Sequence, residues 1–185
     1  MEPPAHPRAR FLEITAIVLN RSGARAAGLW MTEAEHLVQL AFVGDDVLDP
    51  GVARDFAEST REIRLDPTSK LGIIGAATSG KPTISRASEL SPVQGSGRWL
   101  RSFGASRSIA VPLGVEPDPR GLPRCRGVLA VALPQLNDSS DELVVEQLLS
   151  HEAEFLRELR SGEDPGGANV SLREGHRGEP KPFPC

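Results

Sequence analysis

Two apolar runs on either side of a turn-rich segment constrain this chain more than any other feature. The first runs from Ile109 to Val115 and the second from Val128 to Leu133, and both are rich in Val, Ile, Leu and Ala. The residues between them are dense in Pro, Gly and charge, which is typical of the connection between two antiparallel strands. Because the runs are apolar nearly throughout, both faces of these strands must be covered, by helices or by a bound molecule. The sequence therefore predicts a hairpin in the middle of a sheet.

The segments around this hairpin predict a mixed architecture. Apolar periodicity and capping patterns predict helices at residues 10–20, 50–63, 71–78 and 141–159, a first strand pair at 26–32 and 37–43, and a brief edge strand at 83–85. Residues 86–106 lack sustained periodicity, which favours a functional lid or disorder, although Trp99, Leu100 and Phe103 share one helical face for a turn. The predicted fold class is α/β (α+β), with a central antiparallel sheet of five to six strands and helices packed on one or both faces.

Length and composition set the expected domain organisation. The 185 residues suit one domain with some tail left over. Residues 1–9 and 161–185 are rich in Pro or Gly and are expected to be disordered, which leaves one domain over residues 10–160. The net charge of -4 and the absence of nucleic-acid motifs give no reason to expect a nucleic-acid partner.

Cysteine usage and the N-terminal composition predict a cytoplasmic protein. Cys125 and Cys185 are the only cysteines, too few for a disulfide framework or a Cys-based metal site. The apolar stretch at 14–19 is too short for a signal segment or a membrane span. The four His are isolated and lack the spacing of metal ligands. We expect no metal, no cofactor and no membrane association.

Three short motifs resemble those of the GAF domain family. They are residues 71–82 (LGIIGAATSGKP), 107–113 (RSIAVPL) and 127–131 (GVLAV), and with the order of elements they cover about residues 10–160. The resemblance implies a sensory or regulatory signalling module whose sheet holds a small ligand beneath helices, often dimerising through its terminal helices. The motif of the family's cyclic-nucleotide binders is missing here. So are the pocket thiol of its bilin-attaching members and the cysteine set of its free-methionine-sulfoxide reductases.

The resemblance implies a pocket wall of seven residues that precede the apolar run at 109–115. They are Ser85, Arg86, Trp99, Arg101, Phe103, Ser106 and Arg107. Two interpretations of the Arg side chains are open. Between residues 98 and 126, six Arg against two acids give a local charge of +4, which suits charge-assisted hydrogen bonds to an anionic ligand. The second interpretation, which we favour, is that they pair with the acidic final helix or are solvated. Trp99 and Phe103 suit either stacking on a planar ligand or, as we favour, packing in the core.

The leading functional hypothesis is a small-molecule-binding sensory domain that acts on a signalling partner protein, with no catalytic residues. The alternative is a ligand-free dimerisation or adaptor module, in which Phe11, Ile14 and Val18 pair with the final helix of a second copy. A thiol-based reductase using Cys125 ranks third, because a resolving thiol beside it is hard to supply.

Overall fold

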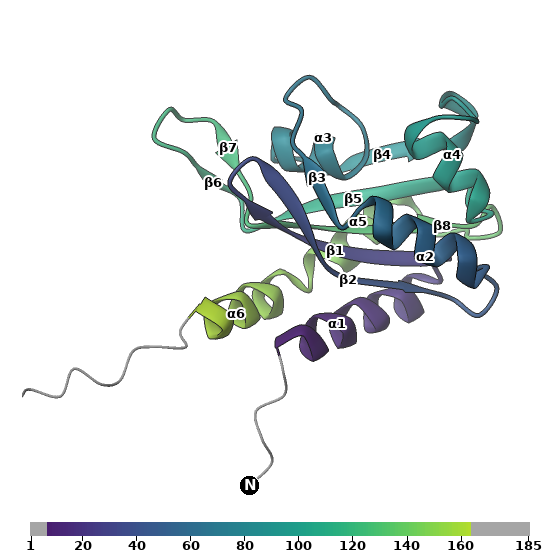
Figure 1. Cartoon of the computed structure of the whole chain (residues 1–185), viewed down its shortest axis with the longest axis horizontal. Coiled ribbons are helices and arrows are strands. Elements are labelled where there is room, and N and C mark those ends of the chain that lie inside the picture. Colours follow the sequence, from purple (N-terminus) through teal and green to yellow (C-terminus); the bar gives the residue numbers. More distant parts are fainter. Residues whose placement is uncertain (1–6, 164–185) are drawn as a thin grey trace, which may run out of the picture.

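A six-stranded antiparallel sheet forms the centre of the molecule, seen in a computed structural model that describes residues 7–163 (Figure 1). The strand order is β3-β2-β1-β8-β5-β4. The strands are β1 (Ala26–Glu33), β2 (His36–Gly44), β3 (Glu62–Arg64), β4 (Thr83–Arg86), β5 (Arg107–Leu113) and β8 (Gly127–Leu133). Helices cover both faces of this sheet, which confirms the predicted α+β class and strand number.

The two apolar runs are β5 and β8, and they pair in antiparallel register from Arg107 opposite Leu133 to Leu113 opposite Gly127. β8 also pairs with β1, so this hairpin lies inside the sheet as predicted. Its connection forms a separate two-stranded ribbon of β6 (Glu116–Pro117) and β7 (Pro123–Arg124), which projects from the body in Figure 1.

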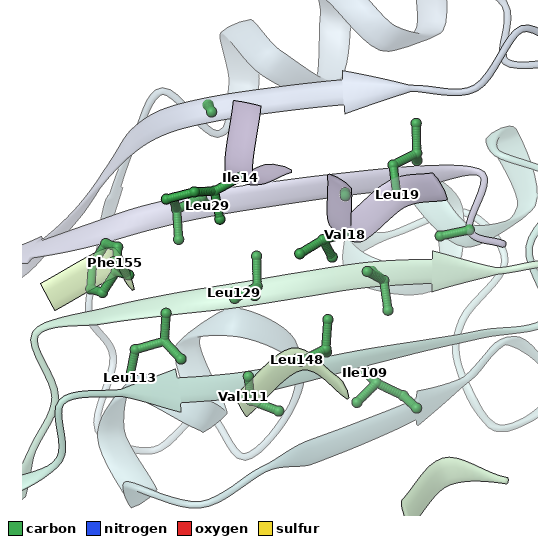
Figure 2. Packing of buried hydrophobic residues seen from close by; sticks show 14 of the residues in the cluster. Ile14, Val18, Leu19, Leu29, Ile109, Val111, Leu113, Leu129, Leu148 and Phe155 are labelled. Carbon is green, nitrogen blue, oxygen red and sulfur yellow. The ribbon is translucent and has the colours of Figure 1, made fainter. Parts of the chain in front are cut away.

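One face of the sheet is covered by the terminal helices α1 (Pro7–Ser22), α5 (Asp141–Leu149) and α6 (Glu152–Glu163). Their buried side chains meet large residues of the central strands, as Figure 2 shows for Ile14, Val18, Leu148 and Phe155. α1 and α6 pack against each other, with the start of α1 and the end of α6 at the same end of the molecule (Figure 1). No helix within residues 7–163 is long and apolar enough to span a bilayer.

The other face of the sheet carries α2 (Pro50–Ser59), α3 (Gly72–Ser79), the short 3-10 helix η1 (Ala87–Glu89) and α4 (Gly95–Ser102). Asp49 caps α2 by accepting a hydrogen bond from the Val52 amide, and Pro50 takes the first helical position, as predicted. Gly80 ends α3 in the left-handed region with φ 65°, also as predicted.

Three predicted elements differ from the structure. The helix expected over 50–63 ends at Ser59, and Ile63 lies instead in β3, because the free edge of β2 offers hydrogen bonds to residues 62–64. The expectation of an irregular segment over 86–106 is wrong for residues 95–102, which form α4. The helix expected over 141–159 is interrupted at Ser150 and His151, and Leu148 of α5 and Phe155 of α6 both pack in the core on the face of the sheet that the terminal helices cover.

The predicted disordered ends mostly lie outside the described residues. α1 begins at Pro7, within the expected arm of residues 1–9, and a proline at the first position of a helix is compatible with its geometry. α6 continues to Glu163, within the expected tail of 161–185. For residues 1–6 and 164–185, Cys185 among them, disorder stays a prediction.

Candidate ligand-binding site

A cavity of about 440 Å³ lies between the sheet and the helices α2, α3 and α4. Its lining comes from the three central strands, from β2 and β3, and from all three of these helices. Ligand sites in proteins typically enclose about 300–1,000 Å³. The cavity therefore has the volume of a small-molecule site.

The floor of the cavity is a grid of six small residues on three adjacent strands. Strand register aligns them in two rows, one of Ala26, Ala132 and Ser108 and one of Gly28, Ala130 and Ala110. Successive side chains of a strand point to opposite faces, so residues two apart on each strand share this face. The cavity exists here because no large side chain rises from the middle of the sheet.

Large residues occupy the opposite face of the same strands. Ile109, Val111, Leu129 and Leu133 alternate with the small floor residues and pack in the cluster formed with α1, α5 and α6. Figure 2 shows the first three of these side chains. The sequence holds this signal as an alternation of residue size within the two apolar runs. The prediction of a covered hairpin rested on apolar character alone and did not use this difference in size, so it missed the floor.

The wall of the cavity is aromatic. Five of the eight aromatic residues in the chain meet there: Trp30, Phe42, Phe56, Trp99 and Phe103. Phe56 of α2 contacts the other four, with ring centroids 4.8 Å from Phe42, 5.0 Å from Phe103, 5.1 Å from Trp99 and 6.4 Å from Trp30. Three of the four contacts are edge-to-face, the arrangement that ring quadrupoles favour.

Trp30 lies over its own strand, and Gly28 makes room for it. A Cβ atom on Gly28 would come 2.2 Å from the Trp30 ring. The indole Nε1 donates a hydrogen bond of 3.0 Å to the carbonyl oxygen of Thr60, at the end of α2. A glycine at this position therefore lets the ring lie flat against β1 and tie α2 to the sheet.

The first turns of α3 and α4 border the cavity at the same place. Gly72 and Gly95 open these helices, both with positive φ (57° and 55°), and neither helix has a side-chain N-cap. A Cβ on Gly72 would lie 3.3 Å from the Ser96 hydroxyl, so the two N-termini are neighbours. Leu71, Gly72, Ser96 and Gly95 all line the cavity.

The structure separates the seven residues predicted for the pocket wall. Trp99 and Phe103 line the cavity, whereas the other five do not border it. Ser85 is buried beside it and accepts a hydrogen bond from the Gly72 amide at 3.3 Å. Arg101 is exposed on α4, and Ser106 is half-buried, with its hydroxyl 3.4 Å from the Leu133 carbonyl. A ligand-binding role for the seven residues stays a prediction.

Arg86 and Arg107 face away from the cavity. Arg86 of β4 is paired with Arg107 of β5, and the neighbouring pair is Ser85 with Ser108. Because successive side chains of a strand point to opposite faces, and Ser108 faces the cavity, the two Arg side chains lie on the face covered by α5. Both form ion pairs with Asp141, and Arg107 also donates to the carbonyls of Asn137 and Ser139. For these two side chains the structure shows pairing with the final helical segment.

Cys125, between β7 and β8, is buried and lies outside the cavity lining. Its Sγ is 3.5 Å from the Thr32 hydroxyl and 3.7 Å from the Ala77 carbonyl. Burial raises the pKa of the Cys125 thiol, so at neutral pH the group is a thiol and not the nucleophilic thiolate. Within residues 7–163 no group of three or more His, Cys, Asp or Glu is placed to hold a metal.

We expect the native Cys125 thiol to react at least about tenfold more slowly with a thiol reagent than it does in the denatured chain. The rate should rise only at alkaline pH, since the raised pKa delays ionisation. Ionisation in the unfolded chain comes first, so this group lowers stability as pH rises above its ordinary pKa. Labelling kinetics of Cys185→Ser test this, and equal native and denatured rates would contradict it.

No protein-family model matches this chain, and no curated protein matches its sequence. Solved structures match its fold. The GAF domain region of a putative membrane protein from Geobacter sulfurreducens PCA has a TM-score of 0.59 at 11% identity, covering 84% of this chain and 93% of that chain. A free methionine-R-sulfoxide reductase from Neisseria meningitidis, in complex with its substrate, has a TM-score of 0.53 at 18% identity, covering 85% and 81%. A segment of a methyl-accepting chemotaxis protein has a TM-score of 0.55 at 14% identity, covering 84% and 92%.

These similarities show that the chain has a GAF-like fold, which confirms the resemblance at the level of architecture. The sequence identities are all below 20%, and one of the three proteins is a reductase. Fold similarity of this kind does not fix a ligand or a reaction, because unrelated sites are built on one scaffold.

Proposed function

We propose that this domain is a sensory or regulatory module that binds a small molecule in the cavity and passes the bound state to a signalling partner protein. The observation that carries the proposal is the cavity of about 440 Å³, with a floor of small residues and a wall of five aromatic rings. The similarity of the fold to a chemotaxis protein and to a GAF domain region supports a role of this class.

Packing energetics favour a ligand in this cavity over a space left empty. Apolar surface that stays in contact with water forgoes about 25 cal/mol of stabilisation per Å² relative to the same surface when buried. The cavity is partly open to solvent and Trp30 already covers Gly28, so the small residues at the other five floor positions leave apolar surface in contact with water unless another molecule covers it. A bound apolar molecule supplies the missing contacts.

The elements around the cavity suit transmission of the bound state. A ligand on the floor touches α2, α3 and α4 at once, through Phe56, Ile73 and Trp99. These three helices lie on the face of the sheet away from α1 and α6. Binding is therefore expected to order the outer face of α3 and α4, which we propose that the partner protein contacts.

The alternative, a ligand-free dimerisation or adaptor module, loses the observation that motivated it. Phe11, Ile14 and Val18 are buried within their own chain, in the cluster that contains Leu148 and Phe155. They are not available to a second copy, and a homodimer stays a prediction. The reductase alternative is weakened by the burial of Cys125 outside the cavity.

Thermal-shift screening of the whole chain against a panel of small metabolites and aromatic compounds tests the proposal. A compound present at about 100-fold its Kd stabilises a folded protein by about 2.7 kcal/mol. For a domain of this size this corresponds to a rise in Tm of about 5–10 °C. We expect at least one compound of the panel to produce such a rise.

Ala130→Leu is the matched test of location, because Ala130 is a half-buried floor residue and a Leu side chain there occupies the cavity. The variant is expected to abolish the thermal shift while remaining folded. Ala153→Leu, on the exposed side of α6, makes the same chemical change away from the cavity and should keep the shift. The proposal fails if no compound shifts Tm, or if the shift persists in Ala130→Leu.

A further inference from the structure

We propose that the ligand of this cavity is an uncharged, planar and largely apolar molecule of one or two fused rings. This inference rests on the proposed function and names the chemical class of the ligand. It departs from the anionic ligand that the Arg-rich sequence between residues 98 and 126 suggests.

None of the described residues that line the cavity has an ionisable side chain. The polar side chains of the lining are the hydroxyls of Thr60, Ser69, Ser96 and Ser108 and the two indoles. The Thr60 hydroxyl is already engaged, since it donates to the Phe56 carbonyl and accepts from Gln39. A ligand in this site therefore meets apolar atoms, ring surfaces and a few neutral hydrogen-bonding groups.

The Arg side chains nearest in sequence are committed elsewhere. Arg86 and Arg107 pair with Asp141 on the other face of the sheet. Arg98 lies over the Trp99 ring, 5.1 Å from its centroid, but it is exposed and does not border the cavity. An anion entering the cavity loses its hydration without gaining a cationic side chain, which disfavours it strongly against a neutral molecule of the same shape.

The shape of the cavity selects a flat molecule. The Trp30 ring covers Gly28, and the other five floor positions carry no side chain larger than Ser, so the open part of the floor is a surface of small side chains bordered by an indole. Across from it, the Trp99 and Phe103 rings are inclined at only 30° to each other, with centroids 6.2 Å apart. A planar ring lying on the floor contacts small side chains below and aromatic rings at its side, where offset or edge-on contacts are favourable.

One end of the cavity suits a single polar substituent. The N-termini of α3 and α4 meet there at Gly72 and Ser96. The Gly72 amide donates to Ser85, so a hydrogen-bond acceptor such as a carbonyl or ester oxygen would bind to the Ser96 hydroxyl and to the other first-turn amides of these helices. The same helix dipoles also favour a negative charge. The apolar lining and the helix ends thus make opposite predictions about a carboxylate, and a pair of matched probes separates them.

The probes are methyl para-nitrobenzoate, which is neutral, and para-nitrobenzoate, which is an anion of nearly the same shape. Trp30 and Trp99 are the only tryptophans in the chain and both line the cavity, so quenching of their fluorescence reports occupancy. A free tryptophan amide at the same probe concentrations corrects for absorption and collisional quenching. We expect the ester to bind the wild-type chain at least about tenfold more tightly than the carboxylate, a difference of about 1.4 kcal/mol.

Variants assign the binding to the cavity. Ester binding should be lost in Ala130→Leu and retained in Ala153→Leu, and an ester that binds Ala130→Leu normally binds elsewhere and overturns the inference. If the carboxylate binds as tightly as the ester or more tightly, and Ala130→Leu abolishes that binding, then the inference of an uncharged ligand is overturned. The proposed function stands in that case. Binding of neither probe also overturns the inference, and the thermal-shift panel then decides separately whether the proposed function fails.

Discussion

Replacing Asp141 with Ala is expected to lower the free energy of unfolding by about 3 kcal/mol, because it leaves a buried guanidinium without its carboxylate. Arg107 Nε lies 2.9 Å from Asp141 Oδ1, and the two side chains are only 11% and 15% exposed. The carbonyls of Asn137 and Ser139 that accept from Arg107 hold the guanidinium in place but do not neutralise it. Urea denaturation of Asp141→Ala beside the wild-type chain measures the loss.

Arg86→Ala is the matched control for this prediction. Arg86 pairs with the same carboxylate, but its side chain is 44% exposed, so its removal is expected to cost less than about 1 kcal/mol. The paired change Arg107→Met with Asp141→Leu should recover much of the loss, since an apolar pair avoids the unpaired charge. A loss in Asp141→Ala no larger than that in Arg86→Ala would show that the buried pair is not the source of the effect.

Two phenylalanines on opposite faces of the sheet are expected to separate stability from binding. Phe155→Ala should cost about 3–5 kcal/mol, because its ring is fully buried and packs 6.1 Å from the ring of Phe11. Phe56→Ala should cost less, about 2–3 kcal/mol, because Phe56 is half-buried at the cavity wall. Denaturation of both variants measures these costs.

The effects on binding should be reversed. Phe56→Ala removes the ring that contacts Trp30, Phe42, Trp99 and Phe103, so we expect affinity for the ester probe to fall by about tenfold or more. Phe155→Leu is the folded counterpart for this measurement, and it should bind the probe as the wild-type chain does. Weakened binding in Phe155→Leu with normal binding in Phe56→Ala would contradict the location of the site.

The sequence predicted the architecture well because the main signals are local. The apolar runs that became β5 and β8, the cap of α2 at Asp49 and the end of α3 at Gly80 each depend on residues within one segment. β3 was missed because its existence depends on the edge of β2, about 25 residues earlier in the chain. A strand of three residues has too little pattern of its own to be recognised.

The site was predicted in part. Two of the seven residues that the resemblance placed in the pocket wall, Trp99 and Phe103, line the cavity, whereas Arg86 and Arg107 lie on the other face, and ligand binding by any of the seven stays a prediction. Strand alternation already forbids Arg107 and Ser108 from facing the same side. By this rule Arg107 shares a face with Ile109 and Val111, against the terminal helices.

By itself, the sequence determined most of the strands and helices, with β3 and α4 as exceptions. It also encodes the alternation of small and large residues that leaves one face of β5 and β8 free of large side chains. Only the tertiary structure decided what stands above that face. Trp30, Phe42 and Phe56 come from β1, β2 and α2, and Trp99 and Phe103 come from α4 and its C-terminal end. Only the last two are related by a spacing along the chain. Burial of aromatic surface drives such residues together without regard to their order in sequence, so the cavity and its charge-free lining become visible only in the folded chain.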